Sequence, residues 1–538
     1  MTFAILTKRV ACYAKACTSS CTSSREKMMR LLRPAAAASA ALAAALSTAA
    51  AAPAPHADAS AVGTKNRGFY AAGAPRTRLA PLAMETDFDV VVVGGGIIGL
   101  ATARELLARY PRKRVAVIEK EPEVARHQTG HNSGVIHAGM YYVPGTTMAK
   151  TCVRGAELMY KYCADKQLPT DRVGKLIVAS TPAEHAQVQL LFERGTANGV
   201  KGLKVLTGAE TAALEPAVSA AHSALWSPNT GITDYGLVAK SLAADVIDSG
   251  RGDVKLSFAV TGFEEDAAAG RVVIRGVEPG QVGPVKTVTA AHVITCAGVH
   301  SDRISVLAGG KAEPKVVTFR GTYWQMKPAF KDIVKTNVYP VPTGGGIPVG
   351  VHFTPTVNER RGHNMIIGPG ACLSFSREGY KMSDVRARCA PRDPPLPPPL
   401  LTLLTRAPAV SPSRRWQINF SDILGFITNG AFWSFAFKNP VLSVNELWKD
   451  VNKAAFLRDA QKLVPSVTED MVEPSFTGVM AQVFEADGTA AKDYIFEPGC
   501  LNGKVFNLRN APSPACTASL AIAENVVARA AETFGWKP

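Results

Sequence analysis

The chain has 538 residues and a formal net charge of +16, and this charge is unevenly distributed. Residues 1–86 contain 11 basic and three acidic residues, a net +8, and residues 386–417 contain six arginines and one aspartate, a net +5. The rest of the chain is close to neutral, which excludes the extended basic surface of a nucleic-acid-binding protein. The ten cysteines form no C-x-x-C pair and no zinc-ligand spacing, so reduced thiols and no metal site are expected.

Residues 1–86 are predicted to be an organellar transit peptide. The segment carries arginine, serine and many alanines, including a tract at 35–52, and has few acidic residues. A disordered tail with no targeting role is the alternative. A membrane span is less favoured, because alanine is only weakly apolar.

The first folded unit expected is a β-α-β unit at 88–119. The β-branched run at 90–93 predicts a strand, the periodic apolar residues after it predict a helix, and the run at 115–118 predicts a second strand. Gly94, Gly96 and Gly99 lie between the first strand and the helix and fit the spacing G-x-G-x-x-G.

The three glycines and an acid predict how this unit binds a dinucleotide. The first glycine permits the tight turn, the second lets the pyrophosphate approach the backbone, and the third lets the helix pack on the strand. The phosphates then lie at the helix N-terminus, which favours negative charge. Glu119 follows the second strand, 20 residues after Gly99, where a carboxylate meets a ribose hydroxyl.

Residues 130–142 form a loop rich in glycine and small polar residues, with two histidines. Its backbone and hydroxyl donors suit the second phosphate and ribityl chain of a dinucleotide. His131 and His137 are either catalytic or hydrogen-bonded to neighbouring loops. The second interpretation is favoured for His131, and both stay open for His137.

Downstream, periodic apolar residues predict helices at 150–166, from 182 to about 195, and from about 235. Strands are predicted at 174–180, at 255–266 with a partner at 271–278, and up to Ala297 and Gly298, where small residues let a cofactor lie against the backbone. A more antiparallel sheet is expected from segments at 319–327, 338–342, 349–355 and 363–370. Helical patterns follow at 421–463, and a last helix begins at about Ser513.

Residues 386–417 interrupt this order with eight prolines, six arginines and no periodicity. Such a segment cannot bury a core and is predicted to be disordered or a polyproline II linker. A proline-rich recognition segment and a translated stretch of non-coding sequence are both compatible with this composition.

Three separated pieces of chain therefore build one nucleotide-binding domain. The predicted fold class is α/β, with a discontinuous Rossmann-like nucleotide-binding domain and an inserted, mainly antiparallel α+β substrate domain. The predicted boundaries are 1–86 for the transit peptide, 87–170, 231–310 and 475–538 for the nucleotide-binding domain, 171–230, 311–385 and 418–474 for the substrate domain, and 386–417 for the insert.

This layout is similar to that of flavoproteins of the D-amino-acid oxidase and glycerol-3-phosphate dehydrogenase type. The segments HQTGHNSGVIHAGMYY, GKLIV, TGITDY, CAGVHSDRIS, FRGTY, YPVP, GVHFTP, REGY and RNAPSPA resemble more closely the L-2-hydroxyglutarate dehydrogenase family. The resemblance covers residues 87–385 and 418–538. It implies FAD-dependent oxidation of L-2-hydroxyglutarate to 2-oxoglutarate by hydride transfer from C2 to flavin N5, in mitochondria, with a chloroplast less favoured.

The resemblance also implies which residues bind the cofactor and which partners to expect. The residues that it assigns to FAD are Gly94, Gly96, Gly99, Glu119, Lys120, Thr129, Asn132, Ser133, Gly134, Ala297, Gly298, Asn510, Ala511, Pro512 and Ser513. Electrons are expected to pass to a respiratory acceptor, a quinone or an electron-transfer flavoprotein, and oxygen stays open as an alternative acceptor. No nucleic-acid partner and no transmembrane span are expected, and peripheral membrane association stays open.

The reaction itself requires a base and cations. Histidine is the usual base near neutral pH, so His352 is the first candidate and His137 the second. A strand histidine with satisfied hydrogen bonds is the alternative for His352. Two substrate carboxylates need cations, for which Arg320, Arg377 and Lys175 are candidates, although each could instead form an ion pair within the protein.

One position departs from the family pattern. The chain has methionine at Met480, within GVMAQ, where family members read GVRAQ. An arginine there can meet a substrate carboxylate in related folds, and methionine cannot. Another cation is therefore needed, or the substrate differs.

Three competing hypotheses remain. The first is an FAD-dependent oxidase or dehydrogenase of another small acid, such as an amino acid, another 2-hydroxy acid or glycerol 3-phosphate. The second is a flavin- or nucleotide-binding module without turnover, and the third is an NAD enzyme. A tightly bound yellow cofactor would exclude the third, and the near-neutral body argues against an RNA-associated form of the second.

Overall fold

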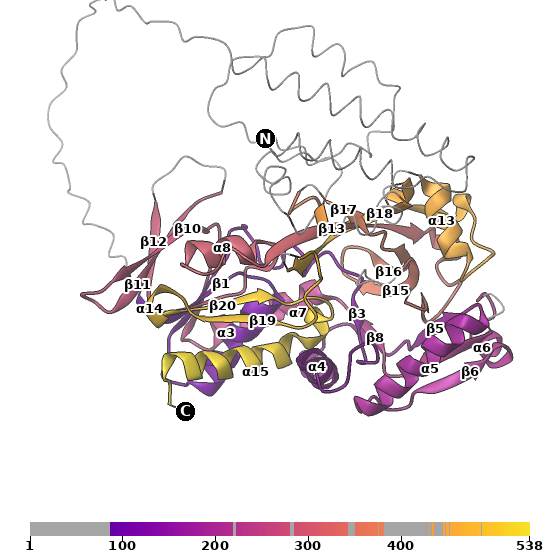
Figure 1. Ribbon diagram of the computed structural model, residues 1–538, viewed down its shortest axis with the longest axis horizontal. Coiled ribbons are helices and arrows are strands. Elements are labelled where there is room, and N and C mark those ends of the chain that lie inside the picture. The colour runs from indigo at the N-terminus through magenta and orange to yellow at the C-terminus, as the bar shows by residue number, and fades with distance from the viewer. Residues whose placement is uncertain are drawn as a thin grey trace, which may run out of the picture. The chain divides into compact units, whose positions relative to one another are not determined.

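The computed structural model describes residues 87–218, 222–279, 285–342, 350–374, 376–380, 452–485 and 487–537, with a few residues between 430 and 450. All belong to a unit that begins at Met84 (Figure 1). The predicted transit peptide, the Pro/Arg-rich insert and most of the helical pattern expected at 421–463 lie outside the described residues. Within the described part of the chain, no helix is both long and apolar enough to cross a membrane.

The first sheet is built around β1 (Asp87–Val93), as the β-branched run predicts. On one side β1 pairs in parallel with β2 (Val115–Ile118), which pairs with β9 (Gly252–Lys255). On the other side it pairs in parallel with β12 (Lys286–Thr295), which pairs with β20 (Val505–Asn510). An antiparallel hairpin of β10 (Ala259–Asp266) and β11 (Arg271–Val277) joins the first half of β12, and β19 (Ile495–Gly499) pairs with β20.

The two faces of this sheet are covered by different elements, because successive strand residues point to opposite sides. Val90 and Val92 face a helical layer, which contains α3 (Ile97–Arg109), α4 (Thr147–Asp165), α7 (Tyr235–Asp248) and α15 (Ala515–Phe534). Val91 and Val93 face the β10–β11 hairpin and the segment that includes α8 (Ser301–Leu307). Figure 1 shows α3 and α15 along one side of the strands. Both faces are buried, so β1 needs a continuous apolar run.

The second sheet is mostly antiparallel, as predicted. Its strand order is β17 (Cys372–Leu373), β13 (Lys315–Met326), β16 (Gly362–Gly368), β15 (His352–Asn358), β14 (Asn337–Pro340), β5 (Lys175–Ala179), β7 (Ser223–Ser227) and β6 (Lys204–Thr207), with β18 (Val472–Phe484) beside β13. Only the β14–β5 pair is parallel among its described pairs. The predicted domain boundary at 474 falls inside β18, whose pairing with β13 continues to Phe484.

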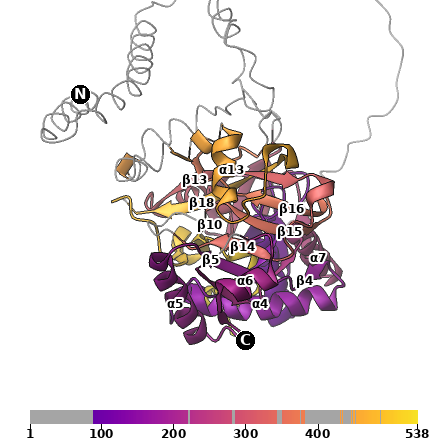
Figure 2. The same ribbon diagram turned by 90° about the vertical axis from the view of Figure 1, so that its right-hand side faces the viewer.

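Smaller elements complete the described part of the chain. A third sheet joins β3 (Val135–Ile136), β8 (Gly231–Thr233) and β4 (Thr170–Asp171), and so fixes the 130–142 loop. Helices α5 (Pro182–Ala197) and α6 (Gly208–Leu214) lie beside β5, β6 and β7 (Figure 2). The remaining elements are α13 (Lys453–Gln461), α14 (Cys500–Gly503), and the 3-10 turns Gly298–His300, Pro328–Phe330 and Glu469–Met471.

Several predicted boundaries differ from the structure. The strand expected at 255–266 is two strands: Lys255 ends β9, and β10 begins at Ala259. The extended conformation is interrupted between them because Ser257 adopts φ = +53°, a conformation that ends a strand. Helix α4 begins at Thr147, where Thr146 caps it, β12 ends at Thr295 rather than at Gly298, and α15 begins at Ala515.

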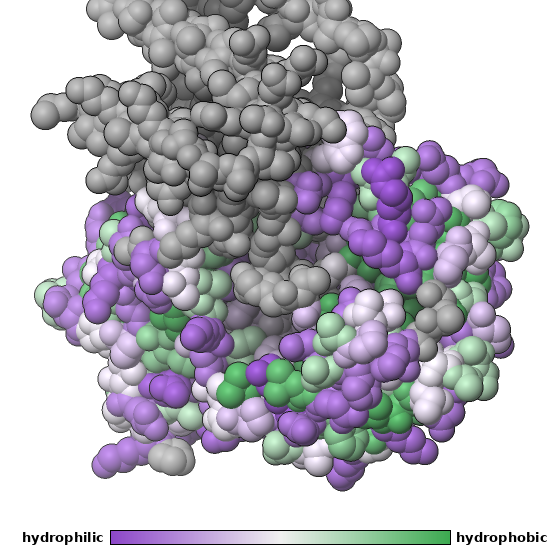
Figure 3. Space-filling model, turned by 45° about the vertical axis from the view of Figure 1, so that its right-hand side comes forward, coloured by the Kyte–Doolittle hydropathy of each residue, from purple (hydrophilic) through white to green (hydrophobic). Residues whose placement is uncertain are grey.

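The surface of the described residues carries both hydrophilic and hydrophobic side chains. On the face in Figure 3, hydrophilic and hydrophobic residues are interleaved over the described part of the chain. The exposed large hydrophobic residues include Val143, Leu214, Ile247 and Val285, which come from separate parts of the chain.

Candidate active site

The glycine turn after β1 has the geometry that a dinucleotide requires. Gly94 has φ = +117°, and a Cβ there would lie 2.4 Å from the carbonyl oxygen of Cys296. A Cβ at Gly99 would lie 2.0 Å from the carbonyl oxygen of Gly94, so α3 packs directly on the turn. At Gly96 the nearest atom is Thr129 Oγ1, at 3.4 Å, so the space that a side chain would fill is left open. This open position is where the spacing predicts a pyrophosphate.

The N-terminus of α3 is also suited to an anion. Its N-cap residue, Gly96, has no side chain to cap it, and its first turn has no acidic residue. Thr129 Oγ1 accepts a hydrogen bond from the Ile97 N–H (3.1 Å), and Glu119 Oε2 accepts one from the Gly95 N–H (2.6 Å). Glu119 therefore lies at the end of β2, against the glycine turn.

The three chain pieces meet around this turn. The Asn132 amide donates to the carbonyl oxygens of Gln128 (2.9 Å) and Thr129 (2.7 Å), and Asn132 Oδ1 accepts from the Gly134 N–H (2.9 Å). Asn132 Nδ2 also lies 3.8 Å from Cys516 Sγ, at the start of α15. A Cβ on Gly298 would lie 3.1 Å from Gln128 Oε1. Residues after β2, after β12 and after β20 thus surround one site.

Nine of the fifteen residues predicted to bind the cofactor are at least partly exposed. They are Gly94, Gly96, Lys120, Asn132, Ser133, Ala297, Gly298, Ala511 and Ser513, whereas Gly99, Glu119, Thr129, Gly134, Asn510 and Pro512 are buried. Among the buried residues, Asn510 stabilises its loop by donating to the carbonyl oxygen of Asp493 (2.8 Å). The Gly96 position without a side chain, the N-terminus of α3 and the carboxylate at the end of β2 fit FAD.

One face of the second sheet carries a row of polar side chains. The pairing registers place Lys175 beside Asn337, and His352 beside Gly368. Leu176, Val338 and Phe353 point to the opposite face, which packs on α13 and neighbouring residues. Because side chains alternate along a strand, Lys175, Tyr339, His352, Thr354 and Tyr323 share the other face. We call Lys175, Tyr339 and His352, together with His137 and Tyr141 of the 130–142 loop, the sheet-face cluster.

The 130–142 loop lies against this face. Ser133 lies close enough to Tyr323 and Tyr339 to offset part of the rise that burial causes in the pKa values of both phenols. His137 and Tyr141 follow in the same loop, with their ring centroids 6.5 Å apart, and the Tyr141 ring lies 5.4 Å from Lys175 Nζ. Ser133 was predicted to contact the cofactor, so the loop connects the predicted cofactor site to the sheet-face cluster.

The sheet-face cluster contains three buried polar atoms without hydrogen-bond partners among the described residues: Lys175 Nζ, His137 Nδ1 and the Tyr141 hydroxyl. Lys175 is fully buried. A buried polar group without a partner costs free energy, and a buried charge costs more. Three such atoms in one cluster indicate a site that a polar ligand completes.

Burial controls the protonation of the cluster. It lowers the pKa of Lys175 to about 7, against a smaller opposing effect of Cys152. Burial, and then the positive charge of Lys175, hold the pKa values of His137 and His352 well below the usual range, so both imidazoles are neutral at pH 7. Burial also raises the pKa of Tyr141, which keeps its hydroxyl a donor. His352 Nδ1 lies 3.1 Å from Thr354 Oγ1, which helps to fix the ring.

The structure brings together three of the five predicted catalytic residues, His352, His137 and Lys175. Arg320 lies four residues before Trp324 in β13, so both side chains point to the face of the sheet that packs on α13. Arg320 forms an ion pair with Asp450. Arg377 forms a buried two-point ion pair with Asp302 (2.5 and 2.9 Å) and donates to the carbonyl oxygen of Val299 (2.6 Å). Met480 is partly exposed in β18, opposite Phe319.

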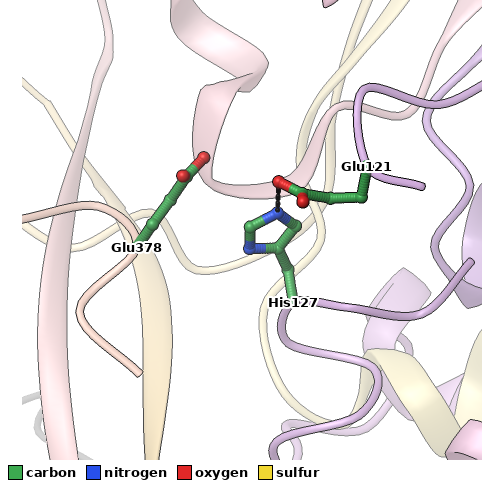
Figure 4. Close-up of side chains that lie close together, drawn as sticks. All are labelled: Glu121, His127 and Glu378. Atoms are coloured by element: carbon green, nitrogen blue, oxygen red, sulfur yellow. Dashed lines mark hydrogen bonds and ion pairs between the residues drawn. The ribbon is translucent and has the colours of Figure 1, made fainter. Parts of the chain in front are cut away.

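A charged cluster lies beside Glu119. Lys120 forms ion pairs with Glu121 and with Glu378 (2.8 Å), and His127 Nε2 lies 3.1 Å from Glu121 (Figure 4). The hydrogen bond from His127 is the main cause that holds the pKa of Glu121 at about 2. Glu121, His127 and Glu378 have ligand atoms within 4.8 Å of one another, which is close enough to hold a metal ion. Lys120 already supplies a positive charge between the two carboxylates.

Sequence reasoning missed four residues of the site. Tyr141 and Tyr339 lie within quoted motifs, but only the sheet register places them beside Lys175. Tyr323 stacks on Phe476 (centroids 4.4 Å apart), and Arg361 covers Phe476 at 4.0 Å while donating to the carbonyl oxygen of Asn132 (3.2 Å). The alternation within FRGTY and YPVP was the one signal that could have shown which tyrosines share a face.

The sequence also matches known proteins. The model of the FAD dependent oxidoreductase family matches residues 89–529. The L-2-hydroxyglutarate dehydrogenase of Nematostella vectensis is 39% identical over 456 residues, which cover 83% of this chain and 91% of that protein. The human enzyme of that name is 36% identical over 485 residues, 87% of this chain and 96% of that protein. The chain belongs to the L-2-hydroxyglutarate dehydrogenase family of FAD-dependent oxidoreductases.

Solved structures agree with the fold of this family. The L-alpha-glycerophosphate oxidase of Mycoplasma pneumoniae, solved with FAD bound, aligns with a TM-score of 0.61 at 23% identity, over 84% of this chain and 95% of that chain. The glycine oxidase of Geobacillus kaustophilus aligns with a TM-score of 0.56 at 17% identity, over 83% and 95%. The predicted fold class and the FAD cofactor are confirmed, and the protein is an FAD-dependent oxidoreductase.

Proposed function

We propose that this protein oxidises L-2-hydroxyglutarate to 2-oxoglutarate in mitochondria and passes the electrons to a quinone or an electron-transfer flavoprotein. The names of its relatives support the substrate and the location. The observation that carries the proposal is the sheet-face cluster, where the buried His352, the partly exposed His137 and an unpartnered buried lysine lie near Ser133. A 2-hydroxy acid requires both a base and a cation.

Three pieces of chain would hold the cofactor. Gly94, Gly96 and Gly99 would hold the pyrophosphate, and Glu119 the ribose of the adenosine half. The Asn132–Gly134 loop, Ala297, Gly298 and the 510–513 loop would line the rest. FAD bound there would supply the acceptor for the hydride from C2 of the substrate. The remaining steps depend on the side chains of the cluster.

His352 acts as the base. Its imidazole is neutral, because burial and the nearby positive charge lower its pKa, so a ring nitrogen can accept the proton of the C2 hydroxyl. Thr354 and the stacked Tyr339 ring (centroids 3.8 Å apart) hold the imidazole in place. Lys175 neutralises a substrate carboxylate. His352 and Lys175 are buried, which strengthens their polar contacts.

The test supplies the purified holoenzyme with an artificial electron acceptor and measures the keto product. The panel is L-2-hydroxyglutarate, L-malate, L-lactate, glycerol 3-phosphate and several amino acids. L-2-hydroxyglutarate is expected to give stoichiometric 2-oxoglutarate with the highest kcat/KM. A higher kcat/KM for an amino acid or for glycerol 3-phosphate would contradict the proposal and favour another small-acid dehydrogenase.

A further inference from the structure

Tyr339 is held between the two functional ends of the sheet-face cluster. The His352 ring stacks on it, with centroids 3.8 Å apart and planes 8° from parallel. Lys175 Nζ lies 3.7 Å from the same ring centroid. Both groups cannot occupy one ring face at these distances without overlapping, so they lie on opposite faces. The phenol ring therefore separates the imidazole from the ammonium group.

Lys175 requires an anion at its end of this stack. It is fully buried, and its Nζ has no hydrogen-bond partner among the described residues. Aromatic faces stabilise an ammonium only partly, so a buried lysine of this kind gains most from a carboxylate. The Tyr141 hydroxyl is the nearby second donor, since its ring lies 5.4 Å from Nζ and the hydroxyl is buried without a partner. One carboxylate can accept from both.

We infer that the Lys175–Tyr339–His352 stack selects substrates by length, with His352 at the C2 hydroxyl and Lys175 and Tyr141 at the carboxylate on the far end of the chain. This inference rests on the proposed function. The distances of 3.8 and 3.7 Å limit the separation between the imidazole centre and Nζ to about 7.5 Å.

The length of the substrate agrees with this separation. Three C–C bonds of about 1.5 Å each join C2 to C5 of 2-hydroxyglutarate, a reach of about 4 Å. A hydrogen bond of about 2.8 Å at either end lets an extended or slightly bent chain reach both groups. Malate is one carbon shorter, and lactate has no second carboxylate. The stack therefore favours a five-carbon 2-hydroxy dicarboxylate.

The deciding experiment compares two acids that differ only at the far end. Anaerobic flavin reduction is measured with L-2-hydroxyglutarate and with L-2-hydroxypentanoate, which has a methyl group in place of the far carboxylate. In Lys175→Met, the half-saturating concentration of L-2-hydroxyglutarate is expected to rise at least about 100-fold, as for loss of a buried charged partner. The value for L-2-hydroxypentanoate is expected to stay the same or fall. Lys204→Met, an exposed position on β6, is the matched control and should behave as wild type.

Tyr141→Phe provides a second variant that keeps the aromatic ring. It should raise the half-saturating concentration of L-2-hydroxyglutarate about tenfold with little change in the limiting rate, because one hydrogen bond to a charged group is lost. If Lys175→Met does not retain FAD, Tyr141→Phe replaces it in the comparison of the two acids. Calorimetry with glutarate, which has both carboxylates and no hydroxyl, adds a readout without turnover: wild type should bind it and Lys175→Met should not.

Two outcomes separate the inference from the function on which it rests. The inference would be overturned if the half-saturating concentration rose equally for both acids in Lys175→Met, or in Tyr141→Phe where that variant is used. The far carboxylate would then not be the group recognised. A wild-type flavin that L-2-hydroxyglutarate does not reduce, while another substrate does, would overturn the proposed function instead.

Discussion

At the scale of single residues, the charge of Lys175 depends on whether a ligand is bound. Burial lowers its pKa to about 7, so near neutral pH about half of the free protein carries the ammonium. A bound carboxylate favours the charged form and raises this pKa. Binding above pH 7 therefore requires proton uptake, and the affinity for glutarate should fall about tenfold per pH unit there.

Calorimetry between pH 6 and about 9, in buffers with different ionisation enthalpies, measures both the affinity for glutarate and the number of protons taken up on binding. Proton uptake that approaches one per glutarate above pH 7 is expected. A pH-independent affinity with no proton uptake would contradict the role of Lys175.

His352 supports a separate kinetic prediction. His352→Gln removes the base but keeps a polar side chain, so the limiting rate of flavin reduction should fall by about 10²–10⁴, while glutarate binding changes little. Stopped-flow absorbance under anaerobic conditions measures this rate. His363→Gln, at an exposed position of the neighbouring strand β16, is the control. An unchanged rate in His352→Gln would transfer the role of base to His137.

At the scale of elements, the close contact between α3 and the glycine turn should be essential for FAD binding. Gly99→Ala places a Cβ 2.0 Å from the carbonyl oxygen of Gly94, which must push the helix away. We expect a destabilisation of about 1–3 kcal/mol and loss of most FAD, measured by thermal unfolding and by the flavin-to-protein absorbance ratio. Gly262→Ala, in β10, has no atom within 4 Å of the new Cβ and should keep its FAD. Full FAD occupancy in Gly99→Ala would contradict this account.

The elements also show what the sequence can predict. The β1–α3–β2 unit was predicted with little error, because glycine spacing and apolar periodicity are local signals. The break at Ser257 was missed, because the Ser257 N–H donates to the carbonyl oxygen of Glu121 (2.9 Å), a contact from a distant segment. The sequence also could not predict which cation lies beside His352. Arg320 and Lys175 are both basic residues in predicted strands, and only the register of the nine-stranded sheet places them on opposite faces.

At the scale of the whole molecule, the site lies where two sheets from interleaved chain segments meet. The 130–142 loop follows the segment after β2 of the first sheet and brings Ser133 close to Tyr323 and Tyr339 of the second. Neither sheet alone contains both the glycine turn and the sheet-face cluster. Local sequence signals therefore predict the cofactor site better than they predict the substrate site.

The location of the protein is also a property of the whole chain. Residues 1–86 fused to a fluorescent protein should be imported into mitochondria, because the segment has the composition of a transit peptide and the relatives are named as mitochondrial. Microscopy with a mitochondrial marker tests this, and a fusion of residues 87–538 is the control that should stay outside. Chloroplast or diffuse cytosolic fluorescence of the first fusion would contradict the prediction.

The central claim is that this site takes a hydride from L-2-hydroxyglutarate, and anaerobic mixing tests it most directly. One equivalent of L-2-hydroxyglutarate should bleach the visible absorbance of the bound flavin rapidly and yield one equivalent of 2-oxoglutarate, while the D-enantiomer leaves the flavin oxidised. A flavin that stays oxidised with the L-enantiomer, or that both enantiomers reduce at the same rate, would contradict the account.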